Sequence, residues 1–151
     1  MLAVHAGLRQ GELLALKWED LDLEAGTLRV RRTLTYAGGK HSLAEPKTKK
    51  SRRTVRLTAG SVTTLRGHLE RQVGEMDRLG PLYRPGGLVF ANEVGGIINP
   101  PNLRNRSFAR LLERAGLPKI RFHDLRHTCA TLLLSATSTP RSSRRCWGTP
   151  T

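Results

Sequence analysis

Residues 123–128 read HDLRHT, which sets an imidazole and a guanidinium three residues apart. If this segment is helical, the spacing puts His123 and Arg126 on one face, where both side chains can reach a single phosphate. A second arginine box, GLRQGELL at 7–14, lies far upstream in the chain. An H-x-x-R pair alone is more often an ordinary surface pair, but two separated arginines and a histidine together predict a clamp for a phosphodiester.

The two boxes belong to a longer series of motifs. GLRQGELL is followed by the acidic segment WEDLD at 18–22, by a basic hairpin and then by HDLRHT. In this order the motifs resemble the catalytic domain of the tyrosine recombinases, the phage integrase family. The resemblance covers residues 1–136 and implies a partial catalytic domain of the α+β class, mainly α-helical with a small antiparallel β-sheet. It also implies a role in site-specific DNA recombination or integration.

The resemblance assigns roles to residues of both boxes. Arg9 and Arg126 match the family's phosphate-binding arginines, and a planar guanidinium can hold two phosphate oxygens at once. His123 matches the histidine that serves the phosphate and proton transfer, and Glu12 matches the acidic residue that supports the first arginine. His127 is expected to have a structural or supporting role.

The basic stretch EPKTKKSRR at 45–53 should supply further contacts. The leaving 5′-oxygen of DNA needs a proton, and a lysine on a mobile hairpin can deliver it. Lys47 best matches the family's hairpin lysine, with Lys49 and Lys50 as rivals. We expect Lys49, Lys50, Arg52 and Arg53 to bind the DNA backbone. The alternative is a solvated patch that contacts phosphates without doing chemistry, as basic runs usually do.

The charge balance favours nucleic acid as the partner. The 151 residues hold 26 Lys and Arg against 12 Asp and Glu, a formal net charge of +14. Neutralising phosphates with such an excess releases counterions, whereas a membrane surface or an anionic protein is the alternative partner. Aromatic residues make up only 5% of the chain, which favours double-stranded DNA over stacking on unpaired bases. Other recombinase protomers are a second class of partner that the resemblance allows.

No cofactor, metal or membrane is expected. The arginines supply the positive charge that a metal would bring, and the sequence has no paired carboxylates suited to two magnesium ions. His123, His127 and Cys129 lack a fourth ligand at a familiar spacing. No apolar run reaches the length of a membrane span, and the first residues do not form a signal peptide. We therefore expect a cytoplasmic protein.

The family's nucleophile is missing from its expected place. Relatives carry a tyrosine beyond the H-x-x-R box, which attacks the phosphate and becomes covalently joined to the DNA. This chain holds only Tyr36 and Tyr83, both upstream of that box. Met1 also stands only eight residues before Arg9. We therefore expect both ends of the functional unit to be absent, and the chain alone to be inactive.

The tail at 137–151 departs from the family and is expected to be disordered, because it has little to bury. A shifted reading frame joins the last base of each codon to the first two bases of the next codon. In that frame, the codons of Cys146-Trp147-Gly148 must encode Leu-Gly. One permitted choice of codons for 139–149 yields the family's PKVVQEVLGH on the same regrouping. We therefore expect a frameshift between Ala136 and Thr139, followed by an early stop.

Hydrophobic periodicity and turn residues predict the order of elements. Helices are expected at 8–18, 59–79, 102–115 and 128–136, and strands at 27–36, 54–57 and 88–90. The residues expected to face the core from the second and third helices are Val62, Leu65, Leu69, Val73, Met76, Phe108, Leu111 and Leu112.

Two other functional hypotheses stay open. The chain could be a binding module that grips duplex DNA without chemistry, or a non-functional remnant that leaves Leu132, Leu133 and Leu134 partly exposed. Steep salt dependence of duplex binding would support the first of these hypotheses. Absence of cooperative unfolding would support the second.

Overall fold

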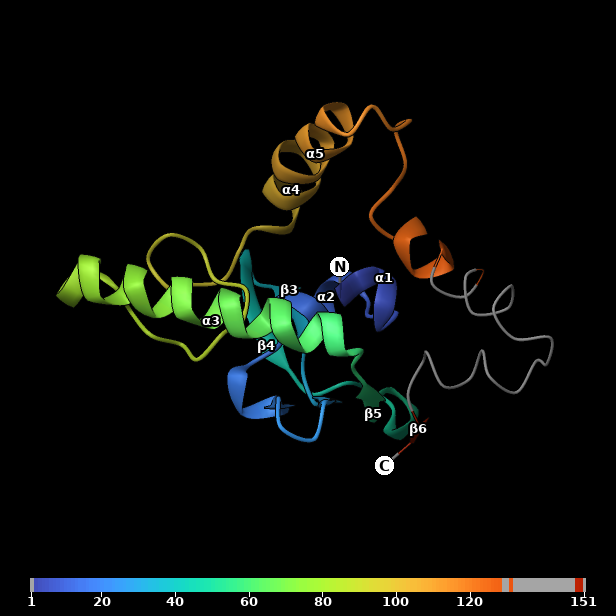
Figure 1. Cartoon of the computed structure of the whole chain (residues 1–151), viewed down its shortest axis with the longest axis horizontal. Coiled ribbons are helices and arrows are strands. Elements are labelled where there is room, and N and C mark those ends of the chain that lie inside the picture. Colours follow the sequence, from blue (N-terminus) through green and yellow to red (C-terminus); the bar gives the residue numbers. More distant parts are fainter. Residues whose placement is uncertain (1, 129–130, 132–148, 151) are drawn as a thin grey trace.

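The computed structural model describes residues 2–128, 131 and 149–150 (Figure 1). The chain begins with the short helices α1 (Leu2–His5) and α2 (Gln10–Leu14) and the turn η1 (Trp18–Asp20). The strands are β1 (Leu21–Asp22), β2 (Thr27–Val30), β3 (Thr33–Ala37), β4 (Lys40–Ala44), β5 (Arg53–Arg56) and β6 (Thr149–Pro150). The turn η2 (Lys49–Ser51) precedes β5, and the long helix α3 (Ala59–Leu79) and the turn η3 (Gly80–Leu82) follow it. The segments α4 (Pro100–Asn102), η4 (Leu103–Phe108) and α5 (Ala109–Arg114) are consecutive, and residues 124–128 form a further helix.

The strands form two separate antiparallel sheets. One sheet has the order β1-β2-β5-β6, and β3 and β4 form a hairpin of their own. The expectation of one continuous strand over 27–36 is therefore wrong. The chain leaves the first sheet at Arg31 and Arg32, whose guanidinium groups lie 3.8 Å and 2.7 Å from carboxylate oxygens of the buried Asp20. These ion pairs hold the break between β2 and β3.

The predicted helix over 59–79 is confirmed as α3. It begins after Thr58, whose hydroxyl accepts a hydrogen bond from the Ser61 backbone N–H at 3.2 Å, as a helix N-cap does. Leu65 places this helix against the first sheet, in a core shared with Leu28 of β2 and Val55 of β5. This core also includes residues of α1 and α2, so it fixes the start of the first arginine box.

One side of α3 differs from the expected apolar stripe. Val73 is 45% exposed, whereas Gln72 is buried. The Gln72 amide accepts a hydrogen bond from Trp18 Nε1 at 2.7 Å and donates to the Tyr83 hydroxyl at 3.1 Å and the Leu88 carbonyl at 3.0 Å. Burial of this amide is favourable because its polar atoms are bonded.

The helix expected over 102–115 is present as α4, η4 and α5, one continuous rod in Figure 1 that ends before Gly116. Gly116 has φ +64°, a conformation that terminates helices and favours glycine. Phe108 and Leu112 are buried as expected, but Leu111 is 61% exposed. Leu111 lines the same apolar cavity as Leu103 and Phe108, and its side chain remains exposed there.

The remaining expectations have mixed outcomes. The first helix is shorter than 8–18, and the strand expected at 88–90 is reduced to a bridge between Leu88 and Lys17. The helix expected over 128–136 and the tail lie outside the described residues, apart from 128, 131 and β6, whose backbone pairs with β5. Within the described ranges, no helix is both long and apolar enough to span a membrane.

Candidate phosphate-binding site

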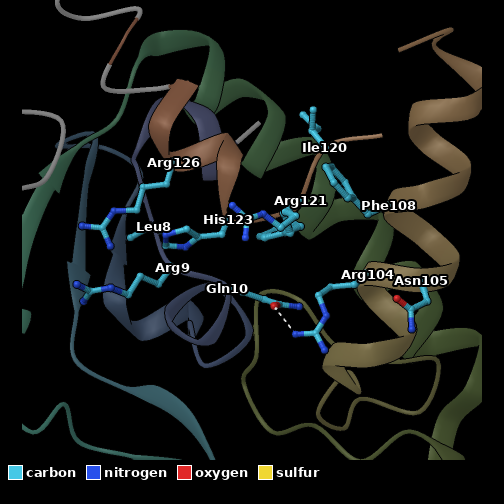
Figure 2. Close-up of a pocket in the computed structure, with 11 residues that line it drawn as sticks. Leu8, Arg9, Gln10, Arg104, Asn105, Phe108, Ile120, Arg121, His123 and Arg126 are labelled. Atoms are coloured by element: carbon cyan, nitrogen blue, oxygen red, sulfur yellow. Dashed lines mark hydrogen bonds between the residues drawn. The ribbon is translucent and has the colours of Figure 1, made fainter. Parts of the chain in front are cut away.

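Arg9, His123 and Arg126 line one cleft of about 520 Å³. Its walls come from segments 8–10, 104–108 and 120–126, which lie far apart in the sequence. Figure 2 shows the guanidinium groups of Arg9 and Arg126 extending in the same direction from two segments, with the His123 ring nearby. The fold therefore brings the two arginine boxes together, as the clamp hypothesis requires.

The backbone at the start of α2 fixes Arg9. Arg9 is the residue before the helix, and its backbone N–H donates to Glu12 Oε2 at 2.9 Å. The Arg9 Nη1 lies 3.4 Å from Glu12 Oε1. The Arg9 side chain stays 53% exposed while that of Glu12 is 3% exposed. Glu12 thus holds the base of Arg9 and leaves the rest of its guanidinium available to a ligand.

Close packing against the hairpin supports the same helix. A Cβ atom added to Gly11 would lie 2.8 Å from Thr33 Oγ1, at the start of β3. Only glycine lets the hairpin approach α2 this closely. The hairpin and the first arginine box are therefore packed as one unit.

The structure corrects the expectation for Arg53. Its side chain is 6% exposed and does not reach the surface as a contact to the DNA backbone would. Instead, Arg53 Nη1 and Nη2 donate to the two Glu12 oxygens at 3.0 Å and 2.9 Å. Burial raises the pKa of Glu12, but the hydrogen bonds from Arg53 and the Arg9 backbone and the charges of both arginines lower it below its usual value. Glu12 is therefore a carboxylate between two guanidinium groups.

Arg126 lies half-buried on the other side of the cleft. Burial, together with the positive charges of Arg9 and Arg53, lowers the pKa of Arg126 to about 10, while Glu12 opposes this shift. Arg126 remains protonated at neutral pH. Three guanidinium groups around one carboxylate leave a local excess of positive charge, which an anion such as phosphate would neutralise.

The second box is held at the start of the helix 124–128. The Asp124 carboxylate accepts a hydrogen bond from the Arg121 backbone N–H at 2.9 Å, and this bond lowers the pKa of Asp124. Phe122 packs edge-on against Phe108, with ring centroids 5.3 Å apart, and contacts the core. Asp124 and Phe122 thus fix the turn from which His123 enters the cleft.

The two histidines of the box are neighbours. The His123 and His127 rings meet edge to face with centroids 5.1 Å apart, and both residues are exposed. Only His123 is among the residues that line the cleft. The position of His127 beside it is compatible with a supporting role.

The exposed basic residues of the β4–β5 connection lie elsewhere. Lys47, Lys49, Lys50 and Arg52 are exposed, and none of these four described residues lines the cleft. Arg52 pairs with Glu45. The structure thus brings Arg9, Glu12, His123 and Arg126 together and leaves Lys47 outside this group.

Sequence reasoning missed further cationic and polar residues of the cleft. Arg104 lines it from η4, and its Nη1 lies 3.4 Å from Gln10 Oε1, while Gln10 Nε2 lies 3.4 Å from the Pro100 carbonyl oxygen. Arg121 lines it from the segment before the second box. The one available signal was the run of arginines from 104 to 110 with no acidic residue among them. Within the part of the chain that the structure describes, no group of three His, Cys, Asp or Glu side chains is arranged to hold a metal ion.

The family model described as "Phage integrase family" matches residues 1–142. A Tyrosine recombinase XerC-like protein of Caldanaerobacter subterraneus subsp. tengcongensis is 40% identical over 145 residues, which cover 88% of this chain and 37% of that protein. Prophage integrase IntR of Escherichia coli is 34% identical over 154 residues, covering 91% of this chain and 36% of that protein. The chain thus spans little more than a third of the length of these relatives.

Solved structures of recombinases share the fold. The Tn1549 transposon integrase in complex with transposon right end DNA has a TM-score of 0.79 at 22% identity, covering 99% of this chain and 49% of that one. The XerH site-specific recombinase bound to difH substrate, in a pre-cleavage complex, has a TM-score of 0.65 at 27% identity, covering 99% and 38%. From the family match over most of its length, the chain belongs to the phage integrase family.

Proposed function

We propose that this chain acts in site-specific DNA recombination or integration, by holding a phosphate of duplex DNA in the cleft of Arg9, His123 and Arg126. The observation that carries the proposal is the convergence of two distant arginine boxes on one exposed, positively charged cleft. The net charge of +14 suits a polyanionic partner. The family membership and the DNA-bound recombinases of the same fold support the same substrate.

Each group of the cleft has a chemical task in this proposal. The forks of Arg9 and Arg126 bind the non-bridging oxygens and meet the negative charge that develops on them during transfer. His123 holds the same phosphate and exchanges a proton with it. Lys47, outside the cleft, matches the residue that would protonate the leaving 5′-oxygen when a nucleophile attacks, and Lys49, Lys50 and Arg52 bind neighbouring phosphates.

The two tyrosines of the chain are poor candidates for the nucleophile. Tyr36 is 68% exposed on β3 with its ring beside His41, and Tyr83 is buried with its hydroxyl bonded to Gln72. Neither residue lines the cleft. We therefore propose that the 151-residue chain alone binds DNA without cutting it. A duplex nicked beside the target phosphate tests this statement, because it traps a covalent protein–DNA adduct on a competent enzyme and should trap none here.

DNA and further recombinase protomers are the partners in this proposal, and the cytoplasm is its place of action. The support for these points is the family membership and the basic charge of the chain.

Salt-dependent binding tests the phosphate clamp. We expect Arg126→Gln to weaken binding of a short duplex about tenfold or more, since it removes charge-assisted hydrogen bonds. We also expect it to reduce the slope of log K against log salt by about 0.9, the value for one phosphate contact. The matched control is Arg78→Gln near the end of α3, remote from the 124–128 helix in Figure 1. Equal losses for both variants would mean that the duplex binds by net charge alone.

A further inference from the structure

We propose that Arg53 is a positioning residue, which holds the Glu12 carboxylate so that Glu12 can orient the Arg9 guanidinium toward a DNA phosphate. The inference rests on the proposed function, because it concerns the same cleft. It assigns a buried residue of β5 to a site whose other members come from α2 and the 124–128 helix.

The hydrogen bonds of Glu12 carry the inference. Glu12 Oε1 accepts from Arg53 Nη1 at 3.0 Å and from Arg9 Nη1 at 3.4 Å. Glu12 Oε2 accepts from Arg53 Nη2 at 2.9 Å and from the Arg9 backbone N–H at 2.9 Å. Each oxygen therefore receives one bond from Arg53 and one from Arg9. The Glu12 carboxylate bridges the two arginines, and the buried Arg53 sets the orientation of its plane.

Burial differs between the two arginines that Glu12 contacts, so that Arg53 is fixed in the interior and Arg9 is accessible to a ligand. The Arg53 and Glu12 side chains are 6% and 3% exposed, whereas that of Arg9 is 53% exposed. A buried charge is tolerated only when it is paired, so the Arg53–Glu12 pair cannot open without a large penalty. Arg9 instead keeps most of its donors free for a ligand.

The planar fork of arginine is the feature that a lysine lacks. Two parallel N–H donors fix both position and rotation of a carboxylate, whereas an ammonium group acts as a point charge. Arg53 also begins β5 directly after the exposed basic segment 47–52. The β4–β5 connection, which we propose to bind DNA, is thus linked through Arg53 and Glu12 to Arg9.

The first test measures the order of the Arg9 side chain in the DNA-free chain. NMR relaxation of the Arg9 Nε–H group should show a rigid side chain in the native protein and a mobile one in Arg53→Lys. The matched control is Arg32→Lys, which changes the partner of the buried Asp20. Among the described contacts, Arg32 makes no bond to Glu12 or Arg9. An Arg9 side chain as rigid in Arg53→Lys as in the native chain would overturn the inference.

The second test is a double-mutant cycle on duplex binding with the full chain. We expect Arg53→Lys and Arg9→Gln each to reduce the slope of log K against log salt by about 0.9. The double variant should show the same reduction of about 0.9 and not the sum of the two. Additive losses would mean that Arg53 contacts DNA itself, which overturns the inference. Absence of salt-dependent binding by the native chain would overturn the proposed function instead, and the Arg9 measurement on the free chain would still judge the role of Arg53.

A second variant covers the case in which Arg53→Lys unfolds. Glu12→Met with Arg53→Met replaces the whole pair by apolar side chains of similar length, a change that folded proteins often accept. Cooperative thermal unfolding establishes that this variant is folded. A folded double variant should show a mobile Arg9 and a salt slope reduced by about 0.9. A folded double variant with a rigid Arg9 and an unchanged slope would contradict the proposal.

Discussion

Glu12 is the residue on which the cleft depends, because it lies almost fully buried between two guanidinium groups. A carboxylate in this position pairs with the buried Arg53 and with the exposed Arg9 at the same time. The family resemblance implied the contact of Glu12 with Arg9, three residues before it. The contact with Arg53 depends on how β5 lies beside α2, and no local pattern encodes that.

The first prediction at this scale concerns acid stability. The pKa of Glu12 is lowered in the folded chain, so its stabilisation is complete above the usual value of 4.5 and is lost as the pH falls from 4.5 through the lower folded value. Glu12→Gln should remove this part of the pH dependence. It should also destabilise the chain by about 3–5 kcal/mol at neutral pH, because Arg53 loses its charged partner. Urea unfolding between pH 3 and pH 7 measures both effects, and an unchanged pH profile in the variant would refute them.

The second prediction concerns Arg126, whose positive charge favours DNA binding but lowers the stability of the DNA-free chain. Burial and two neighbouring guanidinium groups lower the pKa of Arg126 to about 10, so its charge is unfavourable in the free chain. Arg126→Met should raise the melting temperature by about 2 °C while duplex binding weakens about tenfold or more. Thermal unfolding and DNA titration of the same sample check this result. A lower melting temperature would show that Arg126 stabilises the free fold.

At the scale of elements, the hairpin β3–β4 supports the first arginine box through its close approach to α2. Hydrophobic periodicity predicted the bounds of α3, because a long apolar repeat acts locally. It failed for 27–36, where ion pairs of Arg31 and Arg32 with Asp20 end the strand. It also failed for the burial of Leu111, which lines an apolar cavity with Phe108 but stays exposed there.

Gly11→Ala tests the packing of the hairpin on α2. The new Cβ would lie 2.8 Å from Thr33 Oγ1, so we expect a loss of about 1–3 kcal/mol of unfolding free energy. Thr33→Ala in the same chain removes that oxygen and should restore part of the loss. The control is Gly67→Ala, where a Cβ meets nothing within 4 Å, and helix propensity should add about 0.5–1 kcal/mol of stability. Similar effects of the two alanines in urea unfolding would contradict the packing argument.

At the scale of the whole molecule, motif order predicted three of the residues that line the cleft. Arg9, His123 and Arg126 could be named in advance because the order of the motifs along the chain resembles that of the family. Arg104 and Arg121 could not, since only the folded chain brings η4 and the segment before the second box to Arg9. The chain spans little more than a third of the length of the XerC-like and IntR relatives.

The tail gives a prediction at the same scale. The coding DNA of 139–149, read in the regrouped frame, should encode a segment close to PKVVQEVLGH and a tyrosine further on. Leu-Gly is forced at Cys146-Trp147-Gly148 by the genetic code, and the other positions depend on the codons used. Sequencing the gene decides the matter. Codons that give an unrelated peptide in this frame would exclude the frameshift.

The most direct test of the phosphate clamp is a crystal structure of the chain bound to a short DNA duplex. The account predicts one phosphate of the backbone within hydrogen-bonding distance of both the Arg9 and the Arg126 guanidinium groups, with His123 against the same phosphate and Glu12 still bonded to Arg9 and Arg53. A duplex bound on another face, with no phosphate between Arg9 and Arg126, would contradict it.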